Sequence, residues 1–331
     1  MNTITSKKGN MKIMNTLKMG KVVVASVIGL AVIASMPGLS LAAFSEKAAG
    51  TRAGQFLKLP VGAKAIGMGE AYTAIADDAN AIYYNVAGIA RLEKKSAELM
   101  YSKYVEETSY FWGGVAMPIS ETIGTIGFGL QYFSAGDIDK TDIRAAKTGT
   151  FSPYDSAFNF AYARHLMGQE NSVGLNIKII NSKIEDSATT FAVDLGLQTQ
   201  RFMEGKLLLG FAVQNLGGSL KFEKESDNLP ILIKLGSGYK VMENWTTSLD
   251  IIFPEDNSPT AAIGSDYKHM INEDMSLSGR FGYNSRGRKV EGFNGITVGF
   301  GFGFQVFAFD YAWMPLGDLG STHRVSLGVK F

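Results

Sequence analysis

The chain has 331 residues, of which 46% are hydrophobic and 19% are charged, so it holds enough apolar material for a core and too little charge for disorder. It contains no cysteine, which excludes disulfide scaffolds, thiolate zinc sites, iron–sulfur clusters and cysteine nucleophiles. The formal net charge is +1, so the chain does not have the excess of basic residues that binding to nucleic acid requires.

Residues 1–42 have the three parts of a secretory signal peptide. Five lysines and no acidic residue precede an apolar run from Val22 to Ala34, and small residues follow. A membrane-spanning helix is the alternative, but this run is well short of the roughly 20 residues that cross the hydrocarbon. We therefore expect cleavage after Ala42 or Ala43, with Met11 as an alternative start of translation.

Residues 43–92 are rich in alanine and glycine and show no alternation of apolar and polar positions. This composition predicts short helices and tight turns, with Asp77 and Asp78 at the start of a helix that continues to Tyr84. A segment of about 50 residues is too short to form a stable core alone. We therefore expect residues 43–92 to pack against the rest of the chain.

From residue 96 to the C-terminus, apolar residues recur at every second position. One such stretch has Phe191, Val193 and Leu195 on one side, with small or polar residues between them. Segments of about ten residues with this period are typical of strands in a transmembrane β-barrel. A water-soluble barrel has the same alternation with its apolar side chains inward, so the alternation alone leaves both possibilities open.

The alternation predicts fourteen strands, near 96–104, 110–117, 123–134, 155–165, 171–184, 189–200, 206–215, 230–240, 244–253, 258–269, 275–284, 293–303, 305–314 and 322–331. The boundary near residue 304 is the least distinct, because no polar turn separates the two strands there.

The lengths of the connections indicate which kind of barrel this is. All the long connections, such as 135–154 and 216–229, follow odd-numbered strands, and the connections after even-numbered strands are short. Outer-membrane barrels have short periplasmic turns and longer external loops, whereas a soluble barrel has no reason to separate them. We therefore predict an all-β fold: a transmembrane antiparallel β-barrel of about 14 strands.

Aromatic residues at the ends of the predicted strands fit the two interfacial girdles of a membrane barrel, although a core position fits any single one of them about as well. These residues are Tyr110, Phe111, Trp112, Trp245, Tyr311 and Trp313. The chain also ends in Phe331 on an alternating strand, as the outer-membrane assembly signal does.

The N-terminal segment reads GQFLKLPVGAKAIGMGEAYTAIADDANAIYYNVAGIA from Gly54 to Ala90, and the C-terminal run reads FDYAWMPLGDLGSTHRVSLGVKF from Phe309 to Phe331. These segments resemble the start and the last two strands of the PorV/PorQ group of outer-membrane proteins, which is itself similar to the FadL long-chain fatty-acid transporters. The resemblance implies a barrel over residues 93–331 whose lumen holds a small helical hatch formed by residues 43–92.

One position departs from the pattern of that group. Val86 stands where the group has proline in Asn-Pro-Ala-Gly, so a rigid turn is lost. We expect Asn85 to cap a helix or to bind backbone groups in the lumen.

The sequence offers candidate lumen residues but no catalytic, cofactor-binding or metal-ligating residue, and we expect no cofactor. The candidates in the hatch are Leu59, Pro60, Gly62, Ile66, Gly67, Met68, Gly69, Asp77, Asp78, Asn85 and Gly88. The polar candidates on the inner face of the barrel are Lys178, Asp194, Asp310 and Arg324. We expect both aspartates to pair with a cation such as Lys178 or Arg324.

The resemblance implies a non-enzymatic protein of the bacterial outer membrane that assists protein export or surface attachment, as in the type IX secretion route. Its partners would be outer-membrane lipid, secretion components and exported proteins. A FadL-like channel for long-chain fatty acids or other hydrophobic small molecules remains open as an alternative. A soluble periplasmic β-barrel enzyme is a third possibility.

Overall fold

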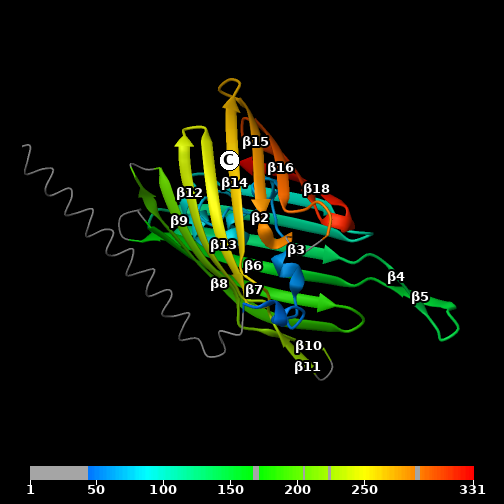
Figure 1. Ribbon diagram of the computed structural model, residues 1–331. Helices are drawn as coiled ribbons and strands as arrows, with labels where there is room; N and C mark the ends of the chain where they lie inside the picture. Colours follow the sequence, from blue (N-terminus) through cyan, green and yellow to red (C-terminus); the bar gives the residue numbers. More distant parts are fainter. Residues whose placement is uncertain (1–43, 167–170, 204–205, 223–224, 288–290) are drawn as a thin grey trace, which may run out of the picture. The chain divides into compact units, whose positions relative to one another are not determined.

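The computed structural model describes residues 44–166, 171–203, 206–222, 225–287 and 291–331, so the predicted signal peptide lies outside the described residues. Within these residues, fourteen strands close into one antiparallel barrel in the order β1-β18-β17-β16-β15-β14-β13-β12-β9-β8-β7-β6-β3-β2 (Figure 1). The first and last strands complete the ring, with Leu99 opposite Leu327. Among the described residues, no helix is long and apolar enough to cross a membrane.

The barrel strands are β1 (Ser96–Lys103), β2 (Ser109–Ser120), β3 (Gly124–Ser134), β6 (Tyr154–Leu166), β7 (Asn171–Lys183), β8 (Ser187–Phe202), β9 (Leu207–Leu216), β12 (Leu232–Met242), β13 (Trp245–Pro254), β14 (Thr260–Met270), β15 (Met275–Asn284), β16 (Ile296–Phe304), β17 (Phe307–Pro315) and β18 (Ser321–Lys330). Two further hairpins are formed by β4 (Ile138–Thr141) with β5 (Lys147–Phe151), and by β10 (Ser219–Phe222) with β11 (Glu225–Asn228).

Each predicted strand corresponds to one barrel strand of the described structure. The indistinct boundary near residue 304 is a tight turn at Gln305 and Val306, where Gln305 has a φ of 51° and Phe304 lies opposite Phe307. The sequence analysis missed the two extra hairpins inside the long connections. Their strands are only four or five residues long and mostly exposed, so they carry little of the buried alternation that marks a barrel strand.

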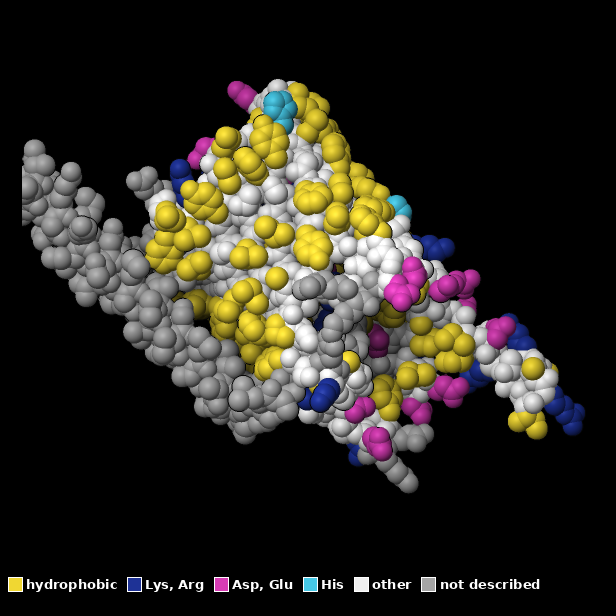
Figure 2. All heavy atoms as spheres, viewed as in Figure 1, with side chains coloured by type: hydrophobic (Ala, Val, Ile, Leu, Met, Phe, Trp, Pro, Cys, Tyr) yellow, Lys and Arg dark blue, Asp and Glu magenta, His cyan; other side chains and the backbone are white. Residues whose placement is uncertain are grey.

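The large apolar side chains face outward and the small or polar ones face inward. In β8, Phe191 is 61% exposed and Leu195 is 43% exposed, whereas Asp194 and Gln198 are almost completely buried. Figure 2 shows hydrophobic side chains spread over the outer surface of the strands in view. A water-soluble barrel would have the opposite arrangement, so the soluble β-barrel considered above as a third possibility is the wrong fold. This is the outer face of a lipid-facing barrel.

Two of the aromatic residues assigned to interfacial girdles point the other way. Tyr110 and Trp112 are on the inward face of β2 and are fully buried. Trp112 donates a hydrogen bond from Nε1 to Oδ1 of Asn80, at 2.8 Å. Their position in the alternation of β2 decides this, because residues two apart share one face of a strand.

The segment 44–92, called the hatch here, forms short helices with turns between them, as predicted. Its helical elements are η1 (Glu46–Ala48), η2 (Gln55–Lys58), α2 (Ala63–Gly67), α3 (Ala81–Tyr84) and η3 (Val86–Arg91). Two more short 3-10 helices lie in the connections of the barrel, at η4 (Ser285–Gly287) and η5 (Gly317–Leu319).

The predicted helix at residues 79–84 begins slightly later than expected. Asp78 does not cap α3 directly. Its Oδ1 accepts a hydrogen bond from the backbone of Asn80 at 3.0 Å, and the helix starts at Ala81.

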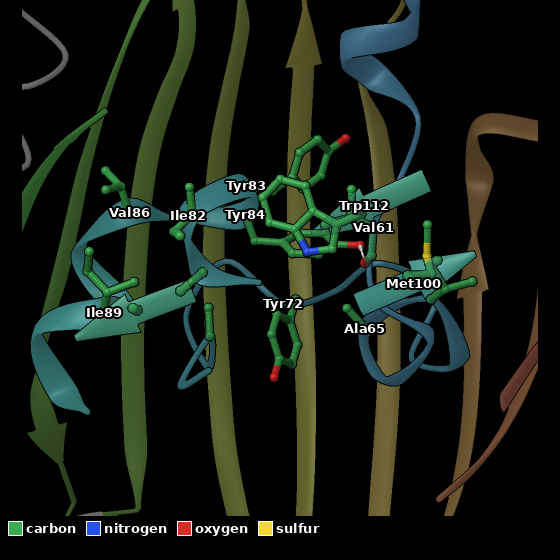
Figure 3. Packing of buried hydrophobic residues seen from close by; sticks show 14 of the residues in the cluster. Val61, Ala65, Tyr72, Ile82, Tyr83, Tyr84, Val86, Ile89, Met100 and Trp112 are labelled. Carbon is green, nitrogen blue, oxygen red and sulfur yellow. Dashed lines mark hydrogen bonds between the residues drawn. The ribbon is translucent and has the colours of Figure 1, made fainter. Parts of the chain in front are cut away.

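The hatch supplies most of the hydrophobic core. Tyr72, Tyr83 and Tyr84 pack together with Trp112 of the wall, and the rings of Tyr83 and Tyr84 meet edge to face at 4.9 Å (Figure 3). The hydroxyl of Tyr84 donates to the carbonyl of Val61 at 2.9 Å, which fixes two hatch turns to each other. The core is therefore inside the ring of strands.

Replacing Leu195 with arginine should lower the free energy of unfolding by about 2–4 kcal/mol, the cost of a basic residue at the middle of a lipid-facing strand. The measurement is denaturant titration in lipid vesicles, followed by tryptophan fluorescence. The control is Ile143→Arg at the fully exposed tip of the β4–β5 hairpin. The control should change stability by less than about 0.5 kcal/mol. Equal stability of both variants would contradict a lipid-facing outer surface.

Candidate functional site: the hatch within the barrel lumen

Glycines on the inner wall let the hatch backbone lie directly against the strands. A Cβ added at Gly282 of β15 would fall on the backbone of Met68 and Gly69, and one at Gly264 of β14 would fall on the carbonyl of Met68. Gly69 has a φ of 66°, which other residues adopt with strain. The turn at 68–69 therefore requires glycine at position 69 and at the facing positions 264 and 282 of the wall.

Asn85 performs both of the roles that we expected of it. Its Oδ1 accepts from the backbone of Ala87 at 3.2 Å and so caps η3. Its Nδ2 donates to the carbonyl of Thr73 at 2.9 Å and to that of Leu197, on the wall, at 3.1 Å. The helix η3 begins at Val86, so the hatch turns here without the proline of the related pattern.

Inward polar side chains of the wall bind backbone groups of the hatch. Asp250 of β13 accepts from the N–H groups of Tyr72 and Thr73 at 3.0 and 2.9 Å. Ser248 donates to the carbonyl of Ala71, and Gln214 of β9 donates to that of Tyr83. The sequence analysis missed these residues. Their only signal was a polar residue at an inward position of an alternating strand.

Lys178 and Asp194 form a buried ion pair, with Nζ and Oδ2 2.8 Å apart. Asp194 also accepts from the side chain of Asn176 and from the backbone of Asn215, and Lys178 donates to Oδ1 of Asn215 at 2.7 Å. The expectation that Asp194 pairs with Lys178 is confirmed. Each of the two buried charges has an opposite charge beside it, which offsets the cost of burying it. The network also links β7, β8 and β9 inside the barrel.

Asp310 pairs with Arg280 and not with Arg324 or Lys178. Nη1 of Arg280 lies 2.5 Å from Oδ1 of Asp310, and its Nε lies 3.0 Å from Oδ1 of Asp266. The sequence analysis did not single out Arg280. The pairing follows from the register, since Arg280 and Asp310 lie on β15 and β17, which flank the glycine-rich β16.

Arg324 is fully buried on the inner face of β18, and none of the described acidic side chains pairs with it. Its guanidinium lies 5.6 Å from the ring centre of Tyr104, and Nη1 contacts Sδ of Met314. Its Nε and Nη2 have no hydrogen-bond partner among the described residues. Lys234 of β12, also buried, lies over the rings of Tyr83 and Tyr84 at 5.1 and 5.4 Å.

The remaining hatch candidates divide into packing and polar positions. Four of them are buried, namely Pro60, Ile66, Met68 and Gly88. Positive φ angles occur at Gly62 and Gly69, and Gly67 lies against Gly299 of the wall. The carbonyl of Leu59 accepts a hydrogen bond from the hydroxyl of Tyr110. The structure therefore brings all of the hatch candidates into one packed segment, and the four inner-face candidates surround it on separate strands.

Asp77 and Asp78 form a charged cluster with Lys64 of α2. Nζ of Lys64 lies 3.0 Å from Oδ1 of Asp77 and 3.6 Å from Oδ2 of Asp78. Burial alone would lower the pKa of Lys64, but Asp77, Tyr72 and Asp78 outweigh it and raise the pKa well above its ordinary value. The pKa of Tyr72 is raised by burial and by Asp78. Lys64 therefore stays charged and Tyr72 stays a hydrogen-bond donor.

A second set of ion pairs ties the start of the hatch to the loop after β13. Arg52 pairs with Glu255 and Lys58 pairs with Asp256, each at 2.8 Å. The backbone N–H of Phe44 also donates to the carbonyl of Glu255. This end of the barrel carries the long connections, so the hatch runs from that end toward the start of β1 at the other.

The described residues contain no cluster of three or more His, Asp or Glu side chains that could hold a metal ion. What the site provides is a packed plug, several compensated charges, and two buried cations beside tyrosines. The packed plug suits closure of the lumen, and the two buried cations suit binding of an anionic group.

The geometry defines an outer-membrane β-barrel with an occupied lumen. The family model of the type IX secretion system protein PorV matches residues 42–252. The chain belongs to the PorV family. Comparison with curated proteins finds no match.

Solved structures with a similar fold are FadL-like channels. The toluene transporter TodX of Pseudomonas putida has 12% sequence identity and a TM-score of 0.53, with 82% of this chain and 97% of that chain covered. A FadL homologue of Pseudomonas aeruginosa has 12% identity and a TM-score of 0.54, with 82% and 98% covered. At this identity, the likeness concerns the fold.

Replacing Gly282 with alanine should loosen the hatch, because the added methyl meets the backbone at 68–69. An overpacking cost of about 1–3 kcal/mol would raise proteolytic cleavage within residues 44–92 by about tenfold. Limited proteolysis of the folded barrel with mass spectrometry measures this. The control is Gly279→Ala on the same strand, where an added Cβ meets nothing within 4 Å. If both variants are protected like the wild type, the seating of the hatch is wrong.

Proposed function

We propose that this protein is a non-enzymatic outer-membrane accessory in the export or surface attachment of other proteins, in a type IX-like route. The observation that carries the proposal is the match of the PorV family to residues 42–252, which span the hatch and the strands up to β13. The partners are secretion components and exported proteins, and the barrel is inserted in outer-membrane lipid.

The packing of the lumen favours a role on the surface of the barrel over a role as a conduit for protein. Tyr72, Tyr84 and Trp112 fill the interior, and the hatch backbone is held by wall residues such as Asp250. Moving an extended polypeptide through the lumen would require breaking these contacts together. The exported protein therefore contacts the loops, and the barrel positions them at the membrane.

The β4–β5 hairpin is the most prominent surface for such a contact. It extends beyond the barrel wall (Figure 1), and Ile143 at its tip is fully exposed. Lys147 pairs with Asp139 at 2.6 Å within the hairpin, and Lys140 pairs with Glu185 of the neighbouring loop at 2.8 Å. An exposed apolar tip between charged strands fits contact with another protein.

The second candidate is a channel for long-chain fatty acids or other hydrophobic small molecules. It is favoured by the two buried cations Arg324 and Lys234, which form no ion pair among the described residues and lie beside tyrosines. Buried cations beside aromatic rings suit an anionic head group with an apolar tail. The fold shared with toluene transporters is compatible with this role.

One deletion strain separates the two candidates. Loss of the gene should abolish secretion and surface attachment of exported proteins and leave uptake of radiolabelled fatty acid or toluene unchanged. Normal secretion with reduced uptake would instead support the channel, and normal secretion with normal uptake would contradict both.

Complementation then tests the hairpin. Restoring the gene with Ile143→Asp should return less than about half of the secreted protein, because a charge replaces an apolar contact. The matched control is Leu319→Asp in η5, which is also exposed and apolar and should restore secretion fully. Equal restoration by both variants would rule out the hairpin tip as the contact.

A further inference from the structure

The barrel holds a cavity at the end that carries the short turns. This vestibule has a volume of about 360 Å³ and lies between the hatch and the strands β1, β14, β15, β16, β17 and β18. Its opening is bordered by the turns after β14 and β16, at Glu273 and Gln305. Neither Arg324 nor Lys234 lines it.

Most of the buried charges in the vestibule compensate one another. Arg280 binds Asp266 and Asp310, at 3.0 and 2.5 Å. Asp78 accepts from the hydroxyl of Tyr72 at 2.8 Å and lies 3.6 Å from Nζ of Lys64. Each of these acids therefore lies near a basic side chain, and Lys268 and Lys330 also line the vestibule.

Glu98 of β1 is the exception. It is 6% exposed, it lines the vestibule, and its Oε1 has no hydrogen-bond partner among the described residues. The amide of Asn80 approaches the carboxylate, but its Nδ2 also lacks a partner at hydrogen-bonding geometry, and an amide carries no charge. A buried carboxylate without a cation costs several kcal/mol.

The surroundings of Glu98 match one class of ligand. Of the exposed charged side chains that line the vestibule, Glu273 and Asp274 are acidic and Lys268 and Lys330 are basic. No set of acidic and histidine side chains in the described residues is arranged to hold a metal ion. A single buried carboxylate suits an organic cation instead, which it can bind through charge-assisted hydrogen bonds.

We propose that the vestibule binds an ammonium or guanidinium group, with Glu98 as its counter-ion. The group is carried either by a basic peptide segment or by a polyamine, and it enters past the short turns. The volume accommodates one lysine or arginine side chain with several waters, given about 30 Å³ for each water. The site does not depend on the proposed role in export.

Calorimetry on the purified barrel in detergent tests this site with two probes, trilysine and spermidine. Wild-type protein should bind at least one of them with one-to-one stoichiometry. Binding of trilysine would indicate a basic peptide segment as the ligand, and binding of spermidine would indicate a polyamine. Glu98→Gln should weaken that binding by about tenfold or more, since it removes a charge-assisted hydrogen bond and keeps the shape. Glu121→Gln is the control, because it makes the same change in the exposed β2–β3 turn outside the vestibule.

A second comparison uses only the wild-type protein, so it does not depend on the folding of a variant. The fully N-acetylated form of the bound probe should not bind, because it has lost its positive charge. Absence of binding of both probes at millimolar concentration, equal binding by the Glu98→Gln variant, or equal binding of the acetylated probe would each overturn the proposal.

Discussion

The structure depends on one constraint: backbone groups in hydrocarbon have no water to bind, so each must find a partner within the protein. The ring of strands meets this constraint by pairing β1 with β18 along their length. The hatch faces a related problem, since its short helices leave many backbone groups free inside the lumen. Wall residues such as Asp250, Ser248 and Gln214 bind these groups. The inner face is polar for this reason.

The same constraint divides the side chains between the two faces. Outward positions carry large apolar residues that lie in lipid, and inward positions carry glycine where the hatch touches the wall, as at Gly264 and Gly282. Charges are tolerated inside when they are compensated, as in the Lys178–Asp194 pair. The exceptions are informative. Arg324 and Glu98 are buried and form no ion pair with the described part of the chain, and each is a candidate to bind an opposite charge on another molecule.

The sequence predicted the barrel well, because alternation over ten residues reports directly on which face a residue occupies. It predicted the interior less well. Tyr110 and Trp112 were assigned to the lipid interface although they contact the hatch. Asp310 was paired with the wrong arginine, because its partner Arg280 is two strands away and the choice depends on register. Several contacts between the hatch and the wall, such as those of Asp250 with Tyr72 and of Gln198 with Thr73, join residues more than 100 positions apart, and no local pattern encodes them.

Site-directed spin labelling along β8 tests the arrangement of the two faces most directly, and the absence of native cysteine makes single labels clean. Labels would replace residues 191 to 195 one at a time in protein reconstituted into vesicles. At positions 191, 193 and 195 the account predicts that the label is highly accessible to oxygen, which concentrates in lipid. At positions 192 and 194 it predicts low accessibility both to oxygen and to a water-soluble nickel complex. Access of the nickel complex to the odd-numbered positions, or a loss of the alternation, would contradict it.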